Sequence, residues 1–220
     1  MKTRDKIILA SLDLFNERGE RNVTTNHIAA HLNISPGNLY YHFRSKTDII
    51  YEIFLQYQLL VDHYLQLPQG RQLTLEDKIY YLESVFDGLW SYRFFHRDLE
   101  HYLDSDERLR RDYREFTMRC LRTIREILSR LQDAGILCRV EDGHMKSMAL
   151  NVWLVVTSWL SFLKTSQGDD GQEITRDMLR QGVYQVITME IPYLTDEYRD
   201  RVLSLQQKYL PGSLDRMSAI

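Results

Sequence analysis

The side chains best suited to metal or acid–base chemistry in this sequence are histidines that stand near other histidines or carboxylates. His27 and His31 are four residues apart, a spacing at which two imidazoles on one helix face can hold a metal ion. A zinc-protease motif would need a glutamate directly after the first histidine, where Ile28 stands, and no third ligand is indicated. The pair is therefore more typical of a helix surface than of a metal site.

A second polar group lies between positions 96 and 101. Its members are His96, Asp98, Glu100 and His101. Such a mixture, within six residues and without further ligands, favours a solvated turn over a metal centre. The sequence also has neither a glycine-rich phosphate loop nor a Gly-x-Ser-x-Gly nucleophile motif. We therefore expect no enzymatic activity, no metal and no cofactor.

A run of polar and aromatic residues between Ser35 and Lys46 is suited to contact with nucleic acid. Leu39 and Phe43 are four residues apart and give this run one buried helix face. The remaining positions point outward, and they carry the kinds of side chain, or the bare backbone, that meet phosphates and base edges. They are Gly37, Asn38, Tyr40, Tyr41 and His42. Taken alone, the Tyr-Tyr-His cluster could equally be an ordinary surface or part of a core.

The elements before this run are typical of a helix-turn-helix. An apolar face between positions 4 and 18 predicts a first helix, which Thr3 can cap and Gly19 can end. Thr24 can cap a short second helix, and Asn33 stands where the chain must turn sharply. Ser35 can cap the third helix, with a proline in its first turn. Two short helices joined by a turn of three to four residues leave the outer face of the last helix free for the major groove.

This N-terminal part of the sequence resembles the TetR family of bacterial regulators. The run from Ser35 to Lys46 resembles the recognition helix of that family, and residues 7–15 together with Ile28-Ala29 match its pattern. The resemblance covers about the first 50 residues. It implies an all-α fold, with an N-terminal three-helix DNA-binding domain (residues 1–48) and a larger helical domain for effector binding and dimerisation (residues 49–220).

The resemblance also implies roles for individual residues. Thr25 and Asn26 correspond to phosphate and groove contacts, Gly37 and Asn38 to the tip of the recognition helix, and Lys46 to a phosphate anchor at a helix N-terminus. The remaining DNA-contacting positions are Tyr40, Tyr41 and His42. Two departures from the family pattern are Asn26, where many relatives have a basic residue, and Asn33, where glycine is usual.

The rest of the chain is expected to be helical. Long stretches without glycine or proline predict helices at about 46–65, 74–89, 106–134, 144–166, 174–190 and 196–209. A turn and a short helix are plausible within the aromatic-rich segment 90–101, and residues 168–171 are expected to form a loop. The helix at 144–166 is apolar around most of its circumference, which indicates burial on several sides.

By position, the helices at 144–166 and 174–190 match the pair through which the family dimerises. The residues expected to form this interface are Val152, Val156, Trp159 and Phe162. A single large core is the alternative explanation of their apolar character. Bulky residues elsewhere in the body provide candidates for an effector pocket, although aromatic residues at helical spacing more often belong to a core. The pocket candidates are Phe86, Trp90, Phe94, Phe95, Tyr102, Phe116 and Trp153.

Charge and cysteine content agree with an intracellular regulator. The 220 residues carry a formal net charge of −3, yet the first fifty have seven basic and five acidic residues, so the head is mildly basic and the body acidic. Cys120 and Cys138 are expected to be buried thiols in a reducing compartment, and a redox role is the less common alternative. No signal peptide is recognisable, and segment 148–163 is too short and too polar to predict a membrane span with confidence.

The sequence therefore predicts a cytoplasmic, homodimeric regulator that binds double-stranded operator DNA. We expect it to be a repressor released from a palindromic operator by a small apolar or aromatic effector. Two alternatives remain: a helical interaction protein whose headpiece no longer binds DNA, and an activator that uses the same fold without ligand control.

Overall fold

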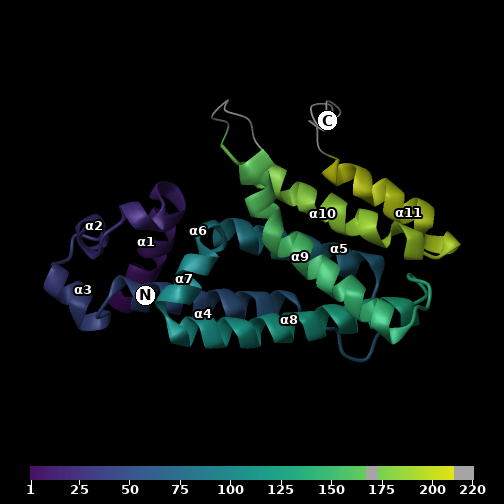
Figure 1. Ribbon diagram of the computed structural model, residues 1–220, viewed down its shortest axis with the longest axis horizontal. Helices are drawn as coiled ribbons and strands as arrows, with labels where there is room; N and C mark the ends of the chain where they lie inside the picture. Colours follow the sequence, from purple (N-terminus) through teal and green to yellow (C-terminus); the bar gives the residue numbers. More distant parts are fainter. Residues whose placement is uncertain (167–172, 211–220) are drawn as a thin grey trace. The chain divides into compact units, whose positions relative to one another are not determined.

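The computed structural model describes residues 1–166 and 173–210, so the loop expected at 168–171 lies outside the described residues. In the part that is described, the only strand-like pairing is one isolated antiparallel bridge between Leu137 and Leu194. The α-helices and 3-10 helices (η) follow in the order α1 Thr3–Arg18, η1 Glu20–Asn22, α2 Thr25–His31, α3 Pro36–His42, α4 Lys46–Tyr64, α5 Leu75–Ser91, α6 Arg93–Arg97, α7 Leu99–Ser105, α8 Glu107–Asp133, α9 Asp142–Ser166, α10 Arg176–Glu190, η2 Ile191–Tyr193, α11 Asp196–Gln206 and η3 Gln207–Tyr209 (Figure 1). The expected all-α fold is confirmed.

The chain divides into two compact units. Unit 1 comprises Met1–His63 and Ser91–Phe116, and unit 2 comprises Tyr64–Trp90 and Thr117–Ile220. The domain boundary expected after residue 48 falls inside unit 1, near the start of α4. The rest of α4 belongs to unit 1 because it packs along the first turns of α8, where the Tyr51 hydroxyl donates to the Asp112 carboxylate at 2.5 Å.

The ends of the headpiece helices follow local capping chemistry. Thr24 Oγ1 accepts from the His27 amide at 3.3 Å, and Ser35 Oγ accepts from the Asn38 amide at 3.1 Å, so both predicted caps are confirmed. Gly19 ends α1 with a φ of +78°, a conformation that side-chain-bearing residues rarely adopt. Thr3 lies inside α1 instead of capping it.

An aromatic cluster forms the core of unit 1. Its rings come from α1, α4, α6, α7 and the first turns of α8, and neighbouring centroids are 5.2 Å apart for Phe15 and Phe94 and 5.5 Å apart for Phe54 and Phe95. The members of this unit 1 aromatic cluster are Phe15, Phe54, Tyr57, Phe94, Phe95, Tyr102, Tyr113 and Phe116. The segment expected to contain a turn and one short helix contains two short helices, α6 and α7, and both contribute to the cluster.

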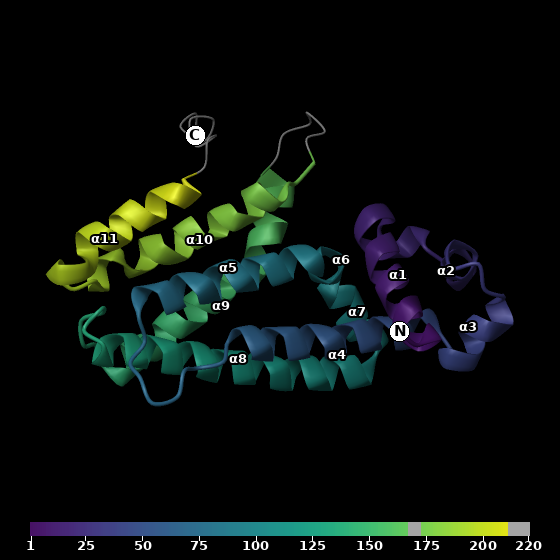
Figure 2. The same cartoon turned by 180° about the vertical axis from the view of Figure 1, so that it is seen from behind.

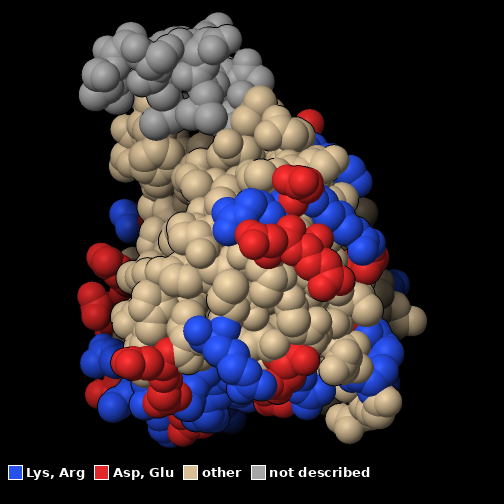
Figure 3. Space-filling view, turned by 90° about the vertical axis from the view of Figure 1, so that its right-hand side faces the viewer, with Lys and Arg blue, Asp and Glu red and all other residues tan. Residues whose placement is uncertain are grey.

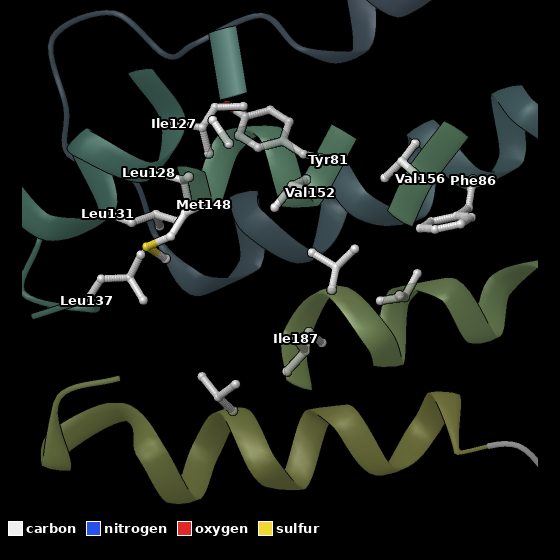
Figure 4. Packing of buried hydrophobic residues seen from close by; sticks show 14 of the residues in the cluster. Tyr81, Phe86, Ile127, Leu128, Leu131, Leu137, Met148, Val152, Val156 and Ile187 are labelled. Atoms are coloured by element: carbon white, nitrogen blue, oxygen red, sulfur yellow. The ribbon is translucent and has the colours of Figure 1, made fainter. Parts of the chain in front are cut away.

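Unit 2 has an aliphatic core between α5, the second part of α8, α9 and α10. Figure 4 shows Tyr81 and Phe86 of α5 facing residues of the other three helices, among them Leu128, Val152 and Ile187. Helix α10 packs against both α9 and α11 (Figures 1 and 2). The core therefore depends on contacts between segments that are more than fifty residues apart in sequence.

Helix α9 is the most apolar helix of unit 2. By length and composition it could cross a membrane. Of the residues in its most apolar 18-residue stretch, 33% are buried inside the protein. Its buried residues recur every three or four positions and form one face: Met145, Met148, Ala149, Val152, Val156, Leu160 and Leu163. The helix is thus buried along one side and not around most of its circumference, as its composition had suggested.

The two cysteines differ in their surroundings. Cys120 is buried, whereas Cys138 is exposed. The expectation of two buried thiols is therefore correct only for Cys120. Cys138 lies in the loop after α8, where its backbone N–H donates to the Tyr193 carbonyl at 2.7 Å as part of the isolated bridge.

Candidate nucleic-acid interface

The turn between α2 and α3 sets the angle between the two helices. Asn33 has a φ of +53°, in the left-handed region that asparagine tolerates better than most residues, so the turn forms without glycine. The Ile34 amide then donates to the Ala29 carbonyl at 3.0 Å. Ala29 is itself buried, which is possible because its side chain is a single methyl group. This geometry fits the helix-turn-helix that the sequence predicted.

The outer face of α3 is largely exposed. Leu39 and Phe43 are buried beneath it, while Gly37 and Asn38 lie exposed at its first turn. Tyr41 is 85% exposed, a large fraction for an aromatic ring, and His42 packs edge-on against it with ring centroids 5.1 Å apart. Tyr41, exposed beside the partly buried His42, is suited to phosphate and base contacts.

Tyr40 is held in place by the preceding helix. Its hydroxyl and the hydroxyl of Thr25, at the start of α2, are 3.0 Å apart. This bond links the two helices across the turn and orients the phenol ring. Asn26, next to Thr25, is exposed. Four of the predicted contact residues, Thr25, Asn26, Tyr40 and Tyr41, therefore lie at the surface of one small α2–α3 unit.

Lys46 is engaged inside the headpiece. Its ammonium donates to the carbonyls of Glu20 and Val23, both at 3.0 Å, and lies 2.6 Å from the Glu20 carboxylate. The Lys46 side chain is 29% exposed, and Glu20 is buried. The residue predicted to be a free phosphate anchor thus fastens η1 to the start of α4. A phosphate would have to compete with, or share, these three contacts.

Two headpiece residues were not recognised in the sequence. Arg44 is exposed directly after α3, and its charge and position were the available signals. Asn16 of α1 joins the headpiece to α6: its amide donates to the Ser91 carbonyl at 2.8 Å and its carbonyl accepts from the Phe94 amide at 3.0 Å. An asparagine on a helix gives no sign in sequence that it holds a segment 75 residues away.

The predicted pocket residues fall into two groups. Phe94, Phe95, Tyr102 and Phe116 are buried among the rings of the unit 1 aromatic cluster. Phe86, Trp90 and Trp153 belong to unit 2, where Phe86 is fully buried and the two tryptophans are partly buried.

The structure supplies a packing reason for the position of Phe86. A Cβ atom on Gly182 of α10 would collide with the Phe86 ring, so this glycine lets the ring pack against the α10 backbone. A pocket of about 370 Å³ in unit 2 has a different lining. It is lined by Glu83, Asp177, Arg180, Gln181, Lys208, Tyr209 and Leu210. None of the predicted pocket residues is among them.

The predicted interface residues of α9 point in different directions. Val152 and Val156 face the core of their own unit and are buried there. Trp159 is partly covered by α10, because its indole N–H donates to the Met178 carbonyl at 3.2 Å, and its ring stacks on Phe162 at 5.1 Å. Phe162 is exposed. Of the four predicted interface residues, only Phe162 is therefore exposed and available to a partner.

Comparisons with known proteins agree with this geometry. Residues 7–53 match the family model described as bacterial regulatory proteins of the tetR family, and residues 56–202 match a second model described as bacterial transcriptional repressor. The crystal structure of a TetR-family transcriptional regulator from Marinobacter aquaeolei VT8 is 64% identical, with a TM-score of 0.89 over 96% of this chain and all of that one.

Two bacterial regulator sequences are more distant. The probable HTH-type transcriptional regulator YttP of Bacillus subtilis is 23% identical over 94% of this chain and 84% of its own length. The HTH-type transcriptional regulator SAR2658 of Staphylococcus aureus is 26% identical over 51% of this chain, and the match spans 59% of that protein. The second family model alone covers about two thirds of the sequence. The chain belongs to the TetR family and is a DNA-binding transcriptional regulator, not an enzyme.

Proposed function

We propose that this protein is a cytoplasmic homodimeric repressor that binds a palindromic operator through α3 and leaves it when a small apolar effector binds. The observation that carries the proposal is the outer face of α3, where Tyr41 is 85% exposed above the buried Leu39 and Phe43. In helix-turn-helix proteins the second helix enters the major groove with its N-terminal residues at the base edges. Gly37 and Asn38 occupy those positions here.

The charges of the body support binding through the headpiece alone. On the face shown in Figure 3, Lys and Arg stand side by side with Asp and Glu, so no field of one sign develops there. In unit 2, Arg176 and Arg180 share the Asp87 carboxylate, at 2.8 and 2.9 Å, so part of their positive charge is offset locally. A cation that shares a carboxylate attracts a phosphate backbone less strongly than an unpaired one.

The exposed side of α9 supports dimerisation. Leu150, Leu154 and Phe162 are 46%, 49% and 39% exposed and follow one side of the helix, with Ser158 between them. An apolar stripe on a helix that is otherwise part of a core marks an interaction site. A two-fold pairing would bring the same stripe from two copies together, and the dimer would then carry two α3 helices, one for each half of a palindrome.

Selection from a pool of randomised duplexes tests the proposal directly. We expect the recovered sequences to share a palindrome. Replacement of Tyr41 by alanine should weaken binding to it by about 5- to 150-fold, because about 1–3 kcal/mol of contact energy is lost per base or phosphate contact. Tyr80→Ala, which removes another exposed tyrosine, on α5, should leave affinity unchanged and serves as the matched control.

The direction of regulation needs a separate measurement. A reporter gene placed behind the selected palindrome should be expressed less when the protein is present, as expected of a repressor. Increased expression would instead identify an activator. Failure to recover any shared sequence, with the protein folded and dimeric, would favour a helical interaction protein over a DNA-binding regulator.

A further inference from the structure

Unit 1 contains buried polar atoms that lack partners. Among the described residues, the buried side-chain atoms without a hydrogen-bond partner are His96 Nδ1, His96 Nε2 and Tyr102 Oη. His96 is only 7% exposed, and Tyr102 is buried as well. A buried polar group left unpaired costs about 1–3 kcal/mol, so native proteins keep such groups where they serve a purpose.

The surroundings of these atoms are aromatic. The His96 imidazole meets the rings of Tyr57 and Phe95 edge-on, with centroids 5.2 and 5.9 Å apart. Phe95 also contacts Tyr102: the two rings are stacked, with centroids 5.7 Å apart. The Tyr102 ring lies 6.0 Å from the Phe94 ring. An imidazole N–H can donate a weak hydrogen bond to the face of an aromatic ring. The lone pair of the second nitrogen cannot, because it needs a hydrogen-bond donor.

The surroundings of His96 disfavour a charge at this position. Burial alone lowers the pKa of His96 to about 4, so the imidazole is neutral near pH 7, with one donor and one acceptor nitrogen. No charged group contributes to that shift. A carboxylate or ammonium brought to this position would lose its hydration without gaining a counter-ion. A molecule that satisfies His96 is therefore uncharged and carries a hydroxyl or N–H donor.

The helix that carries His96 is short and is linked to the headpiece. Helix α6 has five residues, and Tyr92 at its N-cap provides no side-chain capping bond. Its first turn is tied to the headpiece through the bond from the Phe94 amide to Asn16 of α1. Arg21, in η1 of the headpiece, contacts Asp98 just beyond α6 at 3.3 Å. A shift of α6 would therefore displace its contacts with α1 and η1.

We propose that His96 is the polar anchor of the effector site, where it accepts a hydrogen bond from an uncharged aromatic ligand that inserts among Tyr57, Phe95 and the neighbouring rings. The inference rests on the effector control proposed above, for which it names the class of ligand and the contact that reaches the headpiece. The rings are close-packed around His96, so ligand entry requires α6 to move. Movement of α6 pulls on Asn16 and so on the orientation of α1.

Phenol and anisole are suitable probes because anisole has a methyl group in place of the hydroxyl hydrogen and so lacks the donor. Calorimetric titration of the full-length protein should give about fivefold tighter binding of phenol, the ratio that corresponds to a net hydrogen bond of about 1 kcal/mol. Benzoate, which is charged at neutral pH, should not bind. His96→Phe should bind phenol and anisole equally, whereas the control His101→Phe, which replaces an exposed histidine, should keep the preference for phenol.

Three results would overturn this inference. The first is equal binding of phenol and anisole by the native protein, and the second is no binding of either at millimolar concentration. The third is a His96→Phe protein that unfolds at lower urea than the native one, because the imidazole would then be satisfied by a buried water that the phenyl ring cannot replace. A native protein that prefers phenol yet selects no DNA sequence would refute the proposed regulatory function alone.

Discussion

At the scale of single residues, Lys46 has a structural role that its position at a helix start does not reveal. Its ammonium satisfies two backbone carbonyls and the buried Glu20 carboxylate, all of them in or next to η1. These contacts hold η1, which precedes α2, against the first turn of α4. Any effect of Lys46 on DNA binding therefore includes its effect on the shape of the headpiece.

Replacement of Lys46 by methionine should lower stability as well as affinity. The change leaves Glu20 buried without its cation, and a lost hydrogen bond to a charged group costs about 1.5–3 kcal/mol. We expect a lower midpoint in thermal unfolding, and partial recovery when Glu20→Gln is added, because the uncompensated charge is then removed. An unchanged midpoint for Lys46→Met would show that the side chain acts only at the DNA.

At the scale of elements, the contact between α5 and α10 depends on a glycine. The Gly182 position faces Phe86 of α5, and an added Cβ would also lie 2.9 Å from Trp159 Cδ1 of α9. Three helices thus approach one another where a side chain is missing. Because Phe86 is fully buried, its ring cannot move aside without opening space elsewhere in the core.

Gly182→Ala should therefore destabilise unit 2 by about 1–3 kcal/mol, the usual cost of overpacking a core. Urea unfolding measures this change. Gly143→Ala is the matched control, because Gly143 also lies in a helix, α9, but has no atom within 4 Å of the added methyl group. Alanine favours helix over glycine by up to about 1 kcal/mol, so the control should be neutral or stabilising. Similar effects of both substitutions would argue against the tight packing at Gly182.

At the scale of the whole molecule, the exposed stripe of α9 is the surface that we propose for dimerisation. Leu150, Leu154 and Phe162 project from the side of α9 that does not face its own core. Val152 and Val156 stabilise the monomer fold instead, so their substitution would confuse unfolding with dissociation. A test of assembly must therefore use the exposed residues.

Leu154→Glu should convert the protein from dimer to monomer at micromolar concentration, because a buried unpaired carboxylate at an interface costs several kcal/mol. Sedimentation velocity distinguishes the two states. Met118→Glu, at a side chain of similar exposure on α8, should leave the dimer intact. A native protein that sediments as a monomer would refute the dimer proposal, and so would a dimer that persists in Leu154→Glu.

The sequence by itself determined most local features of this protein. Helix ends at Thr24, Ser35 and Gly19 follow from capping and backbone preferences of single residues, which act within a few positions and can be read without a fold. The helix-turn-helix and its outward face follow from the spacing of Leu39 and Phe43 for the same reason. The expected long helices lie close to their observed bounds.

Only the tertiary structure decided which side of each helix meets which neighbour. Lys46 contacts Glu20, which lies 26 positions away, and Asn16 contacts Phe94 of α6, which lies 78 positions away. No local sequence pattern encodes such pairs. Apolar character showed that α9 is part of a core, but it could not separate Val152, which faces that core, from Leu154, which faces outward. Side-chain type records a preference for burial, whereas the partner that provides the burial is set by how the helices pack.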